Sequence, residues 1–102
     1  MGNLTHNPFN RSFRPDTYDL IILQGVLNRW TFGKMAEICS QADPKPRKTS
    51  FIQWRLQRLI DNGYIAKDED AKGTTGSYLL TQPAAEMMKQ YNIIPQADAP
   101  IV

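Results

Sequence analysis

The fold of this chain is decided by residues 49–65, which read TSFIQWRLQRLIDNGYI. Four apolar residues within this stretch recur at positions i, i+4, i+7 and i+8, the spacing of one helix face: Ile52, Leu56, Leu59 and Ile60. Gly63 stands just past this stripe, where a glycine can adopt the left-handed conformation that ends a helix. We therefore predict a helix over residues 49–62, capped by Thr49 or Ser50, that buries the stripe.

The face opposite this stripe is polar and cationic. A helical wheel places on it Ser50, Trp54, Gln57, Arg58 and Asp61, with Phe51, Gln53 and Arg55 at the flanks. The segment from Pro44 to Ile60 holds five of the twelve basic residues and none of the ten acidic ones. It therefore carries +5, while the rest of the chain, with seven basic and ten acidic residues, carries −3. Such a basic block indicates an anionic partner on one face, or simply a solvated helix surface.

Two further helices are predicted before this one. Asp16 can cap a helix over residues 17–28, because its carboxylate accepts backbone N–H groups and suits the positive end of the helix dipole. That helix is apolar around most of its surface, so we expect it at the centre of the core. Thr31 can cap a second helix over residues 32–40. The proline-containing residues 41–47 are interpreted as a turn.

The sequence after the deciding stretch predicts a β-hairpin and a last helix. Residues 64–67 and 77–81 are short extended segments, joined by a loop over residues 68–76. Pro83 can start a helix over residues 84–91. This order of elements predicts an α+β, mostly helical fold with a three-helix core, a hairpin wing and a C-terminal helix.

The two ends of the chain differ from its centre in composition. We expect residues 1–15 to form a basic arm, with Arg11 and Arg14 as its charges. Residues 92–102 are expected to form a flexible tail. Residues 16–91 remain as the domain itself, which is an ordinary length for one.

The residue inventory excludes several classes of protein. Cys39 is the only cysteine and His6 the only histidine, so we expect no disulfide, no metal site and no Ser-His-Asp arrangement. We expect a protein that is not an enzyme and needs no cofactor. No apolar run approaches the roughly 20 residues that cross a bilayer, and no secretory signal is recognised, so we expect a cytoplasmic protein without a membrane partner. Cys39, Met87 and Met88 are interpreted as packing residues.

The order and spacing of these motifs resemble those of a winged helix-turn-helix DNA-binding domain, most of all bacterial regulators of the MarR and PadR type. The resemblance covers about residues 16–91. It is carried by Leu59, Gly63 and Ile65, which match the Leu-x-x-x-Gly-x-Ile phrase at the end of the third helix. The Leu80-Thr81 pair matches the return of the hairpin. The chain departs from the family at residues 83–85, which read Pro-Ala-Ala where the family often has a glycine.

The resemblance implies a small regulator of transcription that binds double-stranded DNA with helix 49–62 in the major groove. Gln53 and Gln57 would pair with adenine edges. Arg55 or Arg58 would pair with guanine. Phosphate contacts would come from Lys45, Arg47, Lys48, Thr49 and Ser50, and wing contacts from Lys72, Thr74 and Thr75. The arm could add contacts. The family builds its dimers with long extra helices, for which this chain has little room, so a homodimer stays open.

Several alternatives remain open at this point. Trp54 could contact a sugar or a thymine methyl group, pack on the arm through Phe9 or Phe13, or anchor a protein partner. Arg58 could pair with Asp61. Three consecutive acids at residues 68–70 would restrict any wing contact to the hairpin tip. Together with the exposed aromatics Phe51 and Trp54, they favour a second hypothesis, a winged-helix module for protein–protein contact within a replication or secretion assembly.

Overall fold

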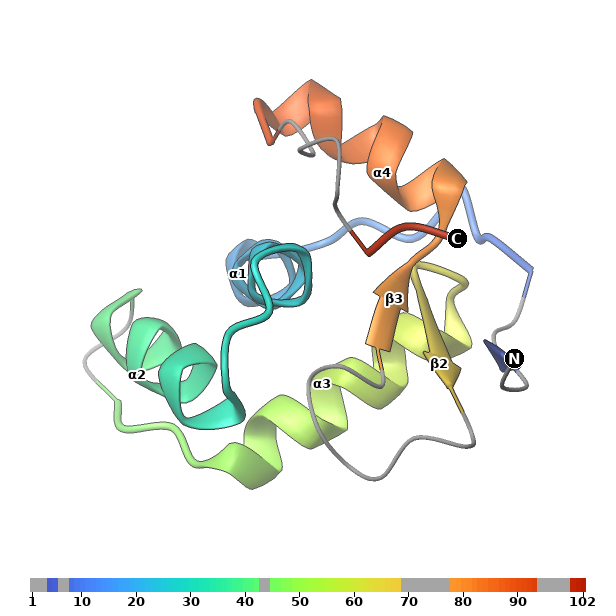
Figure 1. Cartoon of the computed structure of the whole chain (residues 1–102). Coiled ribbons are helices and arrows are strands. Elements are labelled where there is room, and N and C mark those ends of the chain that lie inside the picture. Colours follow the sequence, from blue (N-terminus) through green and yellow to red (C-terminus); the bar gives the residue numbers. More distant parts are fainter. Residues whose placement is uncertain (1–3, 6–7, 43–44, 69–77, 94–99) are drawn as a thin grey trace.

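The fold is α+β and mostly helical, which confirms the predicted class (Figure 1). The computed structural model describes residues 4–5, 8–42, 45–68, 78–93 and 100–102. The described helices are α1 (Thr17–Leu27), α2 (Phe32–Ala42), α3 (Thr49–Asp61) and α4 (Gln82–Met88), and a 3₁₀ turn, η2 (Lys89–Tyr91), follows α4. The described strands are β1 (Leu4–Thr5), β2 (Ile65–Asp68) and β3 (Tyr78–Leu80).

The first two helices begin where the sequence places them. Asp16 and Asp19 form a reciprocal capping box at the start of α1: the Asp19 backbone N–H donates to Asp16 Oδ1 at 2.9 Å, and the Asp16 backbone N–H donates to Asp19 Oδ2 at 3.0 Å. Thr31 Oγ1 accepts the backbone N–H of Lys34 at 3.1 Å, which confirms Thr31 as the cap of α2.

The ends of α3 and the start of α4 differ in part from expectation. Lys48 occupies the cap position of α3 without a side-chain hydrogen bond, so the prediction of Thr49 or Ser50 as the cap is wrong. Both residues already belong to the first helical turn. Gly63 has a φ of 77°, as predicted for the residue that ends this helix. The sequence interpretation missed Thr81, whose Oγ1 caps α4 and lets it begin two residues earlier than predicted.

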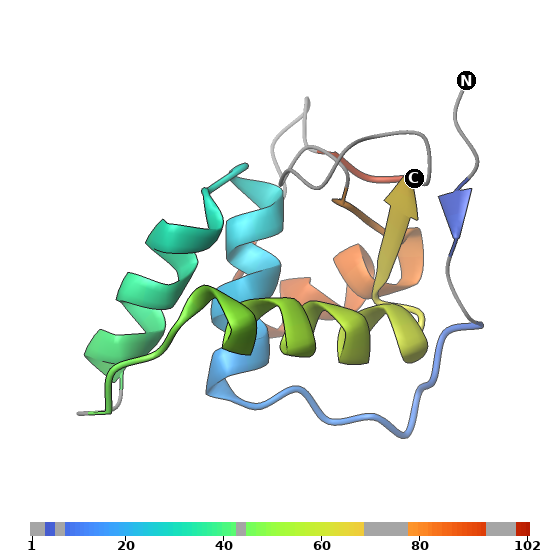
Figure 2. The ribbon, with the colours of Figure 1, turned by 90° about the horizontal axis from the view of Figure 1, so that it is seen from below.

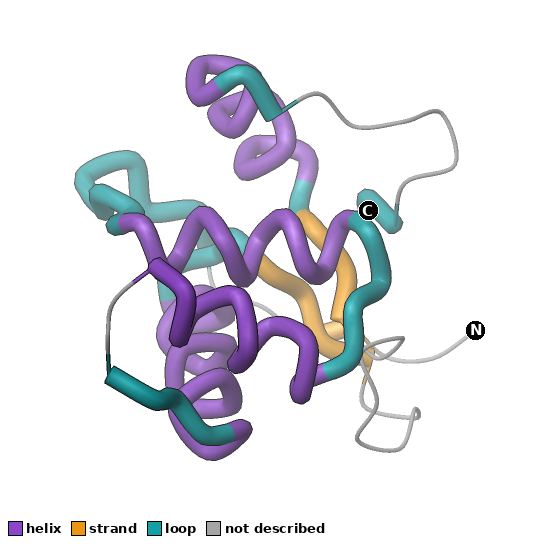
Figure 3. The backbone as a smooth tube through the Cα atoms, turned by 90° about the vertical axis from the view of Figure 1, so that its left-hand side faces the viewer, coloured by secondary structure: helices purple, strands orange, loops and turns teal. Residues whose placement is uncertain are grey.

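The core lies where α1, α2 and α3 pack against one another and against the sheet. The predicted stripe of α3 is buried in it, and so are Cys39 and Met88, which confirms them as packing residues. Met87 is half-buried against the same core. Seen from the α2 side, the helices lie in front and the strands behind them (Figure 3). The packed stripe fixes α3 from behind, so its opposite face is left for solvent.

The sheet has three antiparallel strands in the order β1-β2-β3, where the sequence predicted a hairpin alone. β1 comes from the expected arm and pairs with β2 through Leu4↔Asp68 and Thr5↔Lys67. On the other edge Ile101 bridges Leu80 in parallel, and the backbone of Leu80 exchanges two 2.8 Å hydrogen bonds with residues 100 and 102. Residues 100–102 are therefore part of the folded unit, which corrects the expectation of a flexible tail for these three residues.

The arm is also packed along part of its length. Figure 2 shows the chain between residue 8 and the start of α1 running alongside α3. Asn10 donates its backbone N–H to the Asn62 carbonyl at 2.9 Å. Phe9 and Phe13 place their rings 4.8 and 5.1 Å from the ring of Tyr64. The described arm residues therefore cover one flank of α3, and the prediction of an arm outside the domain is corrected for them.

The packing predicts opposite effects of alanine at two helical glycines, Gly25 and Gly33. A Cβ at Gly25 in α1 would lie 2.8 Å from Cγ of the buried Met35, whereas one at Gly33 in α2 would find its nearest neighbour, Thr31 Oγ1, at 3.9 Å. Overpacking costs about 1–3 kcal/mol and exceeds the helix-propensity gain of about 0.5–1 kcal/mol. We expect Gly25→Ala to destabilise the fold by roughly 1–2 kcal/mol and Gly33→Ala to stabilise it by about 0.5–1 kcal/mol in urea unfolding. Equal effects of the two substitutions would contradict this packing.

Candidate nucleic-acid interface

The outward face of α3 is polar and carries one large aromatic side chain. Ser50, Gln53 and Gln57 are exposed on it, and Trp54 between them is 62% exposed. The Nε2 group of Gln57 donates to Asp61 Oδ1 at 2.9 Å, which holds the amide at the surface. The face thus presents amide and hydroxyl groups around an indole, on a helix that is fixed from behind by its buried stripe.

Trp54 does not pack on the arm. The rings of Phe9 and Phe13, which the sequence offered as its partners, contact Tyr64 instead. The guanidinium of Arg55 lies 5.5 Å from the Trp54 ring and covers one part of it. That alternative for Trp54 is therefore wrong, and contact with DNA or with a protein partner remains.

Arg55 points toward the start of α1, at the margin of this face beside Trp54. Its Nη1 lies 2.7 Å from Asp16 Oδ2 and 3.3 Å from Asp19 Oδ1, and its side chain is only 13% exposed. A guanidinium that is mostly buried and held by two carboxylates has little surface to offer to a base edge. We therefore leave Arg55 out of the candidate interface, although the sequence placed it there.

The Arg58 side chain is partly buried and partly exposed. Its Nη1 lies 3.4 Å from Asp19 Oδ2, and its guanidinium lies 4.7 Å from the centre of the Phe13 ring on the arm. Its side chain keeps 36% of its area exposed. Arg58 thus pairs with a carboxylate on α1, 39 residues away in sequence, whereas the sequence offered Asp61 on the same helix. Arg58 lies at the edge of the exposed face, on the flank that the arm covers.

Asp19 is the acceptor that gathers these two arginines, and the sequence analysis missed this role. Its side chain is fully buried at the start of α1. Burial raises the pKa of Asp19, although the hydrogen bond from the Asp16 backbone and the two arginines act in the other direction. Burial alone would also raise the pKa of Asp16, but the Asp19 backbone hydrogen bond and Arg55 outweigh it and lower that pKa. In the sequence, the signal for this role of Asp19 was its place as a carboxylate in the first turn of an otherwise apolar helix.

Arg47 and Phe51 form a cluster with Tyr18 at the start of α3. The Arg47 guanidinium lies 5.0 Å from the Tyr18 ring and 4.7 Å from the Phe51 ring, and its Nη2 donates to the Tyr18 hydroxyl at 3.0 Å. Phe51 meets Tyr18 edge-on at 5.4 Å and is half-buried against the core. The expectation of Phe51 as an exposed aromatic is therefore corrected, and Arg47 is a packed residue as much as a surface charge.

The remaining predicted contacts lie at the start of α3 and in the hairpin. Lys45, Lys48 and Thr49 are exposed beside Ser50, so this end of α3 is the cationic part of the surface. The wing residues Lys72, Thr74 and Thr75 lie outside the described residues, as do two of the three acids at residues 68–70. Arg11 and Arg14 are exposed on the arm. Of the predicted contacts, the structure thus places on one exposed surface Lys45, Lys48, Thr49, Ser50, Gln53 and Gln57. Arg55 is mostly buried and pairs with Asp16 and Asp19.

Among the residues that the structure describes, no group of three or more His, Cys, Asp or Glu side chains is placed to hold a metal ion. Of the helices in the described ranges, none combines the length and the apolar character that a bilayer span requires. Compared with known proteins, the chain finds no matching family model, no matching curated protein and no matching solved structure.

Proposed function

We propose that this protein is a winged helix-turn-helix regulator of transcription that binds double-stranded DNA, with α3 in the major groove. The observation that carries the proposal is the outward face of α3, where Ser50, Gln53 and Gln57 are exposed on a helix whose back is buried. An α-helix of this width fits the major groove, and side chains that hydrogen-bond can distinguish base pairs there. A rigid support is needed because a base contact is lost when its side chain is misplaced.

The groups left on this face favour A·T base pairs. A glutamine amide pairs with the N6 and N7 positions of adenine. Gln57 gives one Nε2 hydrogen to Asp61 and keeps the second, together with its oxygen, for such a pair. Trp54 offers an apolar surface for a thymine methyl group. Of the two arginines that the sequence offered for guanine, Arg55 is held by Asp16 and Asp19, and Arg58 lies at the edge of the face beside the arm.

Phosphate contacts are assigned to the start of α3. Lys45 and Lys48 precede the helix, and the hydroxyls of Thr49 and Ser50 lie in its first turn, where backbone N–H groups also point outward. The two lysines would each neutralise a phosphate, which would make binding fall roughly tenfold between 50 and 200 mM salt. Such a fall is the signature of counterion release from a phosphate backbone.

The proposal is tested by selecting duplexes from a random library and measuring their affinity at rising salt. We expect enrichment of an A·T-containing site and the steep salt dependence given above. Gln57→Ala should weaken the selected site by about tenfold or more, because a good base pair contact is worth about 1–3 kcal/mol. Gln82→Ala, which removes an exposed amide at the start of α4, is the matched control and should change affinity less than about twofold. Affinity that does not depend on salt would overturn the proposal.

A second candidate function, protein–protein contact, is favoured by the exposure of Trp54. Large exposed aromatics often anchor interfaces. If this function holds, Trp54→Ala should abolish association with a protein partner or a second copy, and no duplex should be selected from the library. Analytical ultracentrifugation of the protein and of Trp54→Ala measures self-association directly.

A further inference from the structure

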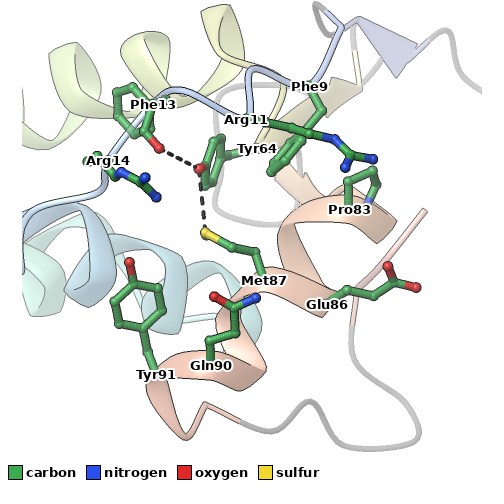
Figure 4. Close-up of a pocket in the computed structure, with 10 residues that line it drawn as sticks. All are labelled: Phe9, Arg11, Phe13, Arg14, Tyr64, Pro83, Glu86, Met87, Gln90 and Tyr91. Atoms are coloured by element: carbon green, nitrogen blue, oxygen red, sulfur yellow. Dashed lines mark hydrogen bonds between the residues drawn. The ribbon is translucent and has the colours of Figure 1, made fainter.

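The aromatic side chains around α3 differ in how far they are covered. The close-up of the pocket between the arm and α4 shows the buried Tyr64 beside Phe9 and Phe13, with its hydroxyl donating to the Phe13 carbonyl at 3.2 Å (Figure 4). Trp54, in the middle of α3, keeps 62% of its area exposed, more than any other large hydrophobic side chain that the structure describes. The indole is therefore the side chain of this surface that gains most when a partner covers it.

Arg55 supports the indole of Trp54 on one side. The guanidinium carbon of Arg55 lies 5.5 Å from the centre of the Trp54 ring. The same guanidinium lies 5.2 Å from the Phe51 ring and 5.4 Å from the Tyr18 ring. Cations are attracted to aromatic rings at these distances. Arg55 thus connects the exposed indole to the packed rings that join α3 to α1.

The Arg55 guanidinium is itself fixed by two carboxylates at the start of α1. Its Nη1 donates to Asp16 Oδ2 at 2.7 Å and to Asp19 Oδ1 at 3.3 Å. The other oxygen of Asp16, Oδ1, caps α1. Charge-assisted hydrogen bonds of this kind hold a guanidinium in one place, so Trp54 rests on a fixed support. A side chain that is ordered before binding loses less conformational entropy when its partner arrives.

We propose that Trp54, positioned by Arg55 and Asp16, recognises the C5-methyl group of a pyrimidine in the major groove. This inference rests on the proposed function of α3. The bases of a duplex are stacked on one another, so a helix in the major groove meets their edges, and the apolar group on those edges is the thymine methyl group. The base 5-methylcytosine carries the same methyl group on the same carbon, so it offers the indole the same contact.

The neighbouring side chain fits such a contact. Gln57 follows Trp54 by three residues, so the two side chains are neighbours on the helix surface. The Gln57 amide suits the N6 and N7 positions of adenine, and the methyl group of a thymine is presented in the same groove. Asp16 and Arg55 are positioning residues in this arrangement, because they act through the indole.

Removing or adding single methyl groups in the selected duplex tests the contact. Each thymine is replaced in turn by uracil and each cytosine by 5-methylcytosine, and the dissociation constant is measured. We expect one position at which the methyl group strengthens binding by about fourfold, the value of one buried methyl group. A thymine at that position assigns thymine as the source of the methyl group, and a cytosine assigns 5-methylcytosine. In Trp54→Ala the same change should alter affinity by less than about 1.5-fold.

Asp16→Asn tests the positioning. Asparagine has one acceptor oxygen in place of two, so it cannot cap α1 and bind Arg55 together. In the free protein, NMR relaxation of the Trp54 indole N–H should give a lower order parameter in this variant. In the complex, the methyl effect should fall from about fourfold to about twofold or less, a ratio within one variant that the change of net charge does not affect. Glu37→Gln removes an exposed carboxylate of α2 and should leave both measurements unchanged.

The outcomes separate this inference from the proposed function. If a duplex is selected and its binding depends on salt, but no methyl group affects affinity or the effect is equal in Trp54→Ala, only the inference is overturned. An order parameter and a methyl effect that are both unchanged in Asp16→Asn would overturn the positioning role of Asp16 and Arg55. If no duplex is selected, the proposed function and this inference fail together.

Discussion

Replacing Asp19 by alanine should lower the free energy of unfolding by about 3–5 kcal/mol, one of the two largest effects we expect from a single substitution. The Asp19 side chain is fully buried, caps the first turn of α1 and lies 3.3 Å from Arg55 and 3.4 Å from Arg58. Its removal leaves the guanidinium of Arg55, itself mostly buried, without one of its two carboxylates. The cost arises from that desolvated charge and from the lost cap, and not from the strength of the ion pair alone.

Asp16→Asn is the matched control for this prediction. Asparagine keeps the capping geometry, and the Asp16 side chain is 46% exposed, so the loss of its charge should cost less than about 1 kcal/mol at neutral pH. Because the folded pKa of Asp16 is lowered, the stability from its charge is present above the unfolded value of 3.8 and is lost as the pH falls through the folded pKa. Urea unfolding of both variants at neutral pH measures the difference. Equal costs for Asp16→Asn and Asp19→Ala would contradict the central role of Asp19.

Replacing Tyr64 by alanine should cost a further large amount, about 3–5 kcal/mol, and should also release the arm. The Tyr64 ring is buried between Phe9 and Phe13, and its hydroxyl is hydrogen-bonded to the Phe13 carbonyl. Tyr64→Phe keeps the ring and removes only the hydroxyl, so it should cost about 1 kcal/mol. Hydrogen exchange at the Asn10 amide, which is bonded to Asn62, reports the release of the arm directly. Retained protection of that amide in Tyr64→Ala would contradict this view of the arm.

The same tyrosine predicts an alkaline loss of stability. Burial, and then the neighbouring Tyr91, raise the pKa of Tyr64 above its ordinary value of 10.0. The folded state therefore holds this proton after the unfolded state has released it. The contribution of Tyr64 to stability is complete below pH 10 and falls as the pH rises through the folded pKa. Unfolding measured from pH 8 to pH 11 should show a steeper decline for the wild type than for Tyr64→Phe.

The elements of the fold could be predicted because their signals are local. The apolar stripe of α3 has helical spacing within nine residues, and the caps at Asp16 and Thr31 act on backbone groups three residues away. The partners of Arg55 and Arg58 could not be predicted in this way, because their carboxylates lie 36 to 39 residues away. A basic run in a sequence shows where charges are, but not which of them the interior will neutralise.

Part of the candidate surface could be predicted, because its signal is local to one helix. Gln53, Trp54 and Gln57 follow from the wheel of one helix, since they lie opposite its buried stripe. The covering of one flank by the arm depends on Phe9 and Phe13 meeting Tyr64, which follows α3 in the chain. In the sequence, Phe9 and Phe13 were the signal that the arm packs on the domain, because isolated aromatic residues in a polar segment need an apolar partner. The sequence did not identify Tyr64 as that partner, because only the fold brings the three rings together.

The covered edges of the sheet have a consequence for how this protein behaves at high concentration. A bare strand edge can recruit the strand of another molecule and so begin a fibril. In this fold residues 4–5 occupy one side of the β2–β3 hairpin and residues 100–102 the other. A strand of another molecule could pair with β2 or β3 only after one of these segments had dissociated. Each segment therefore opposes fibril formation.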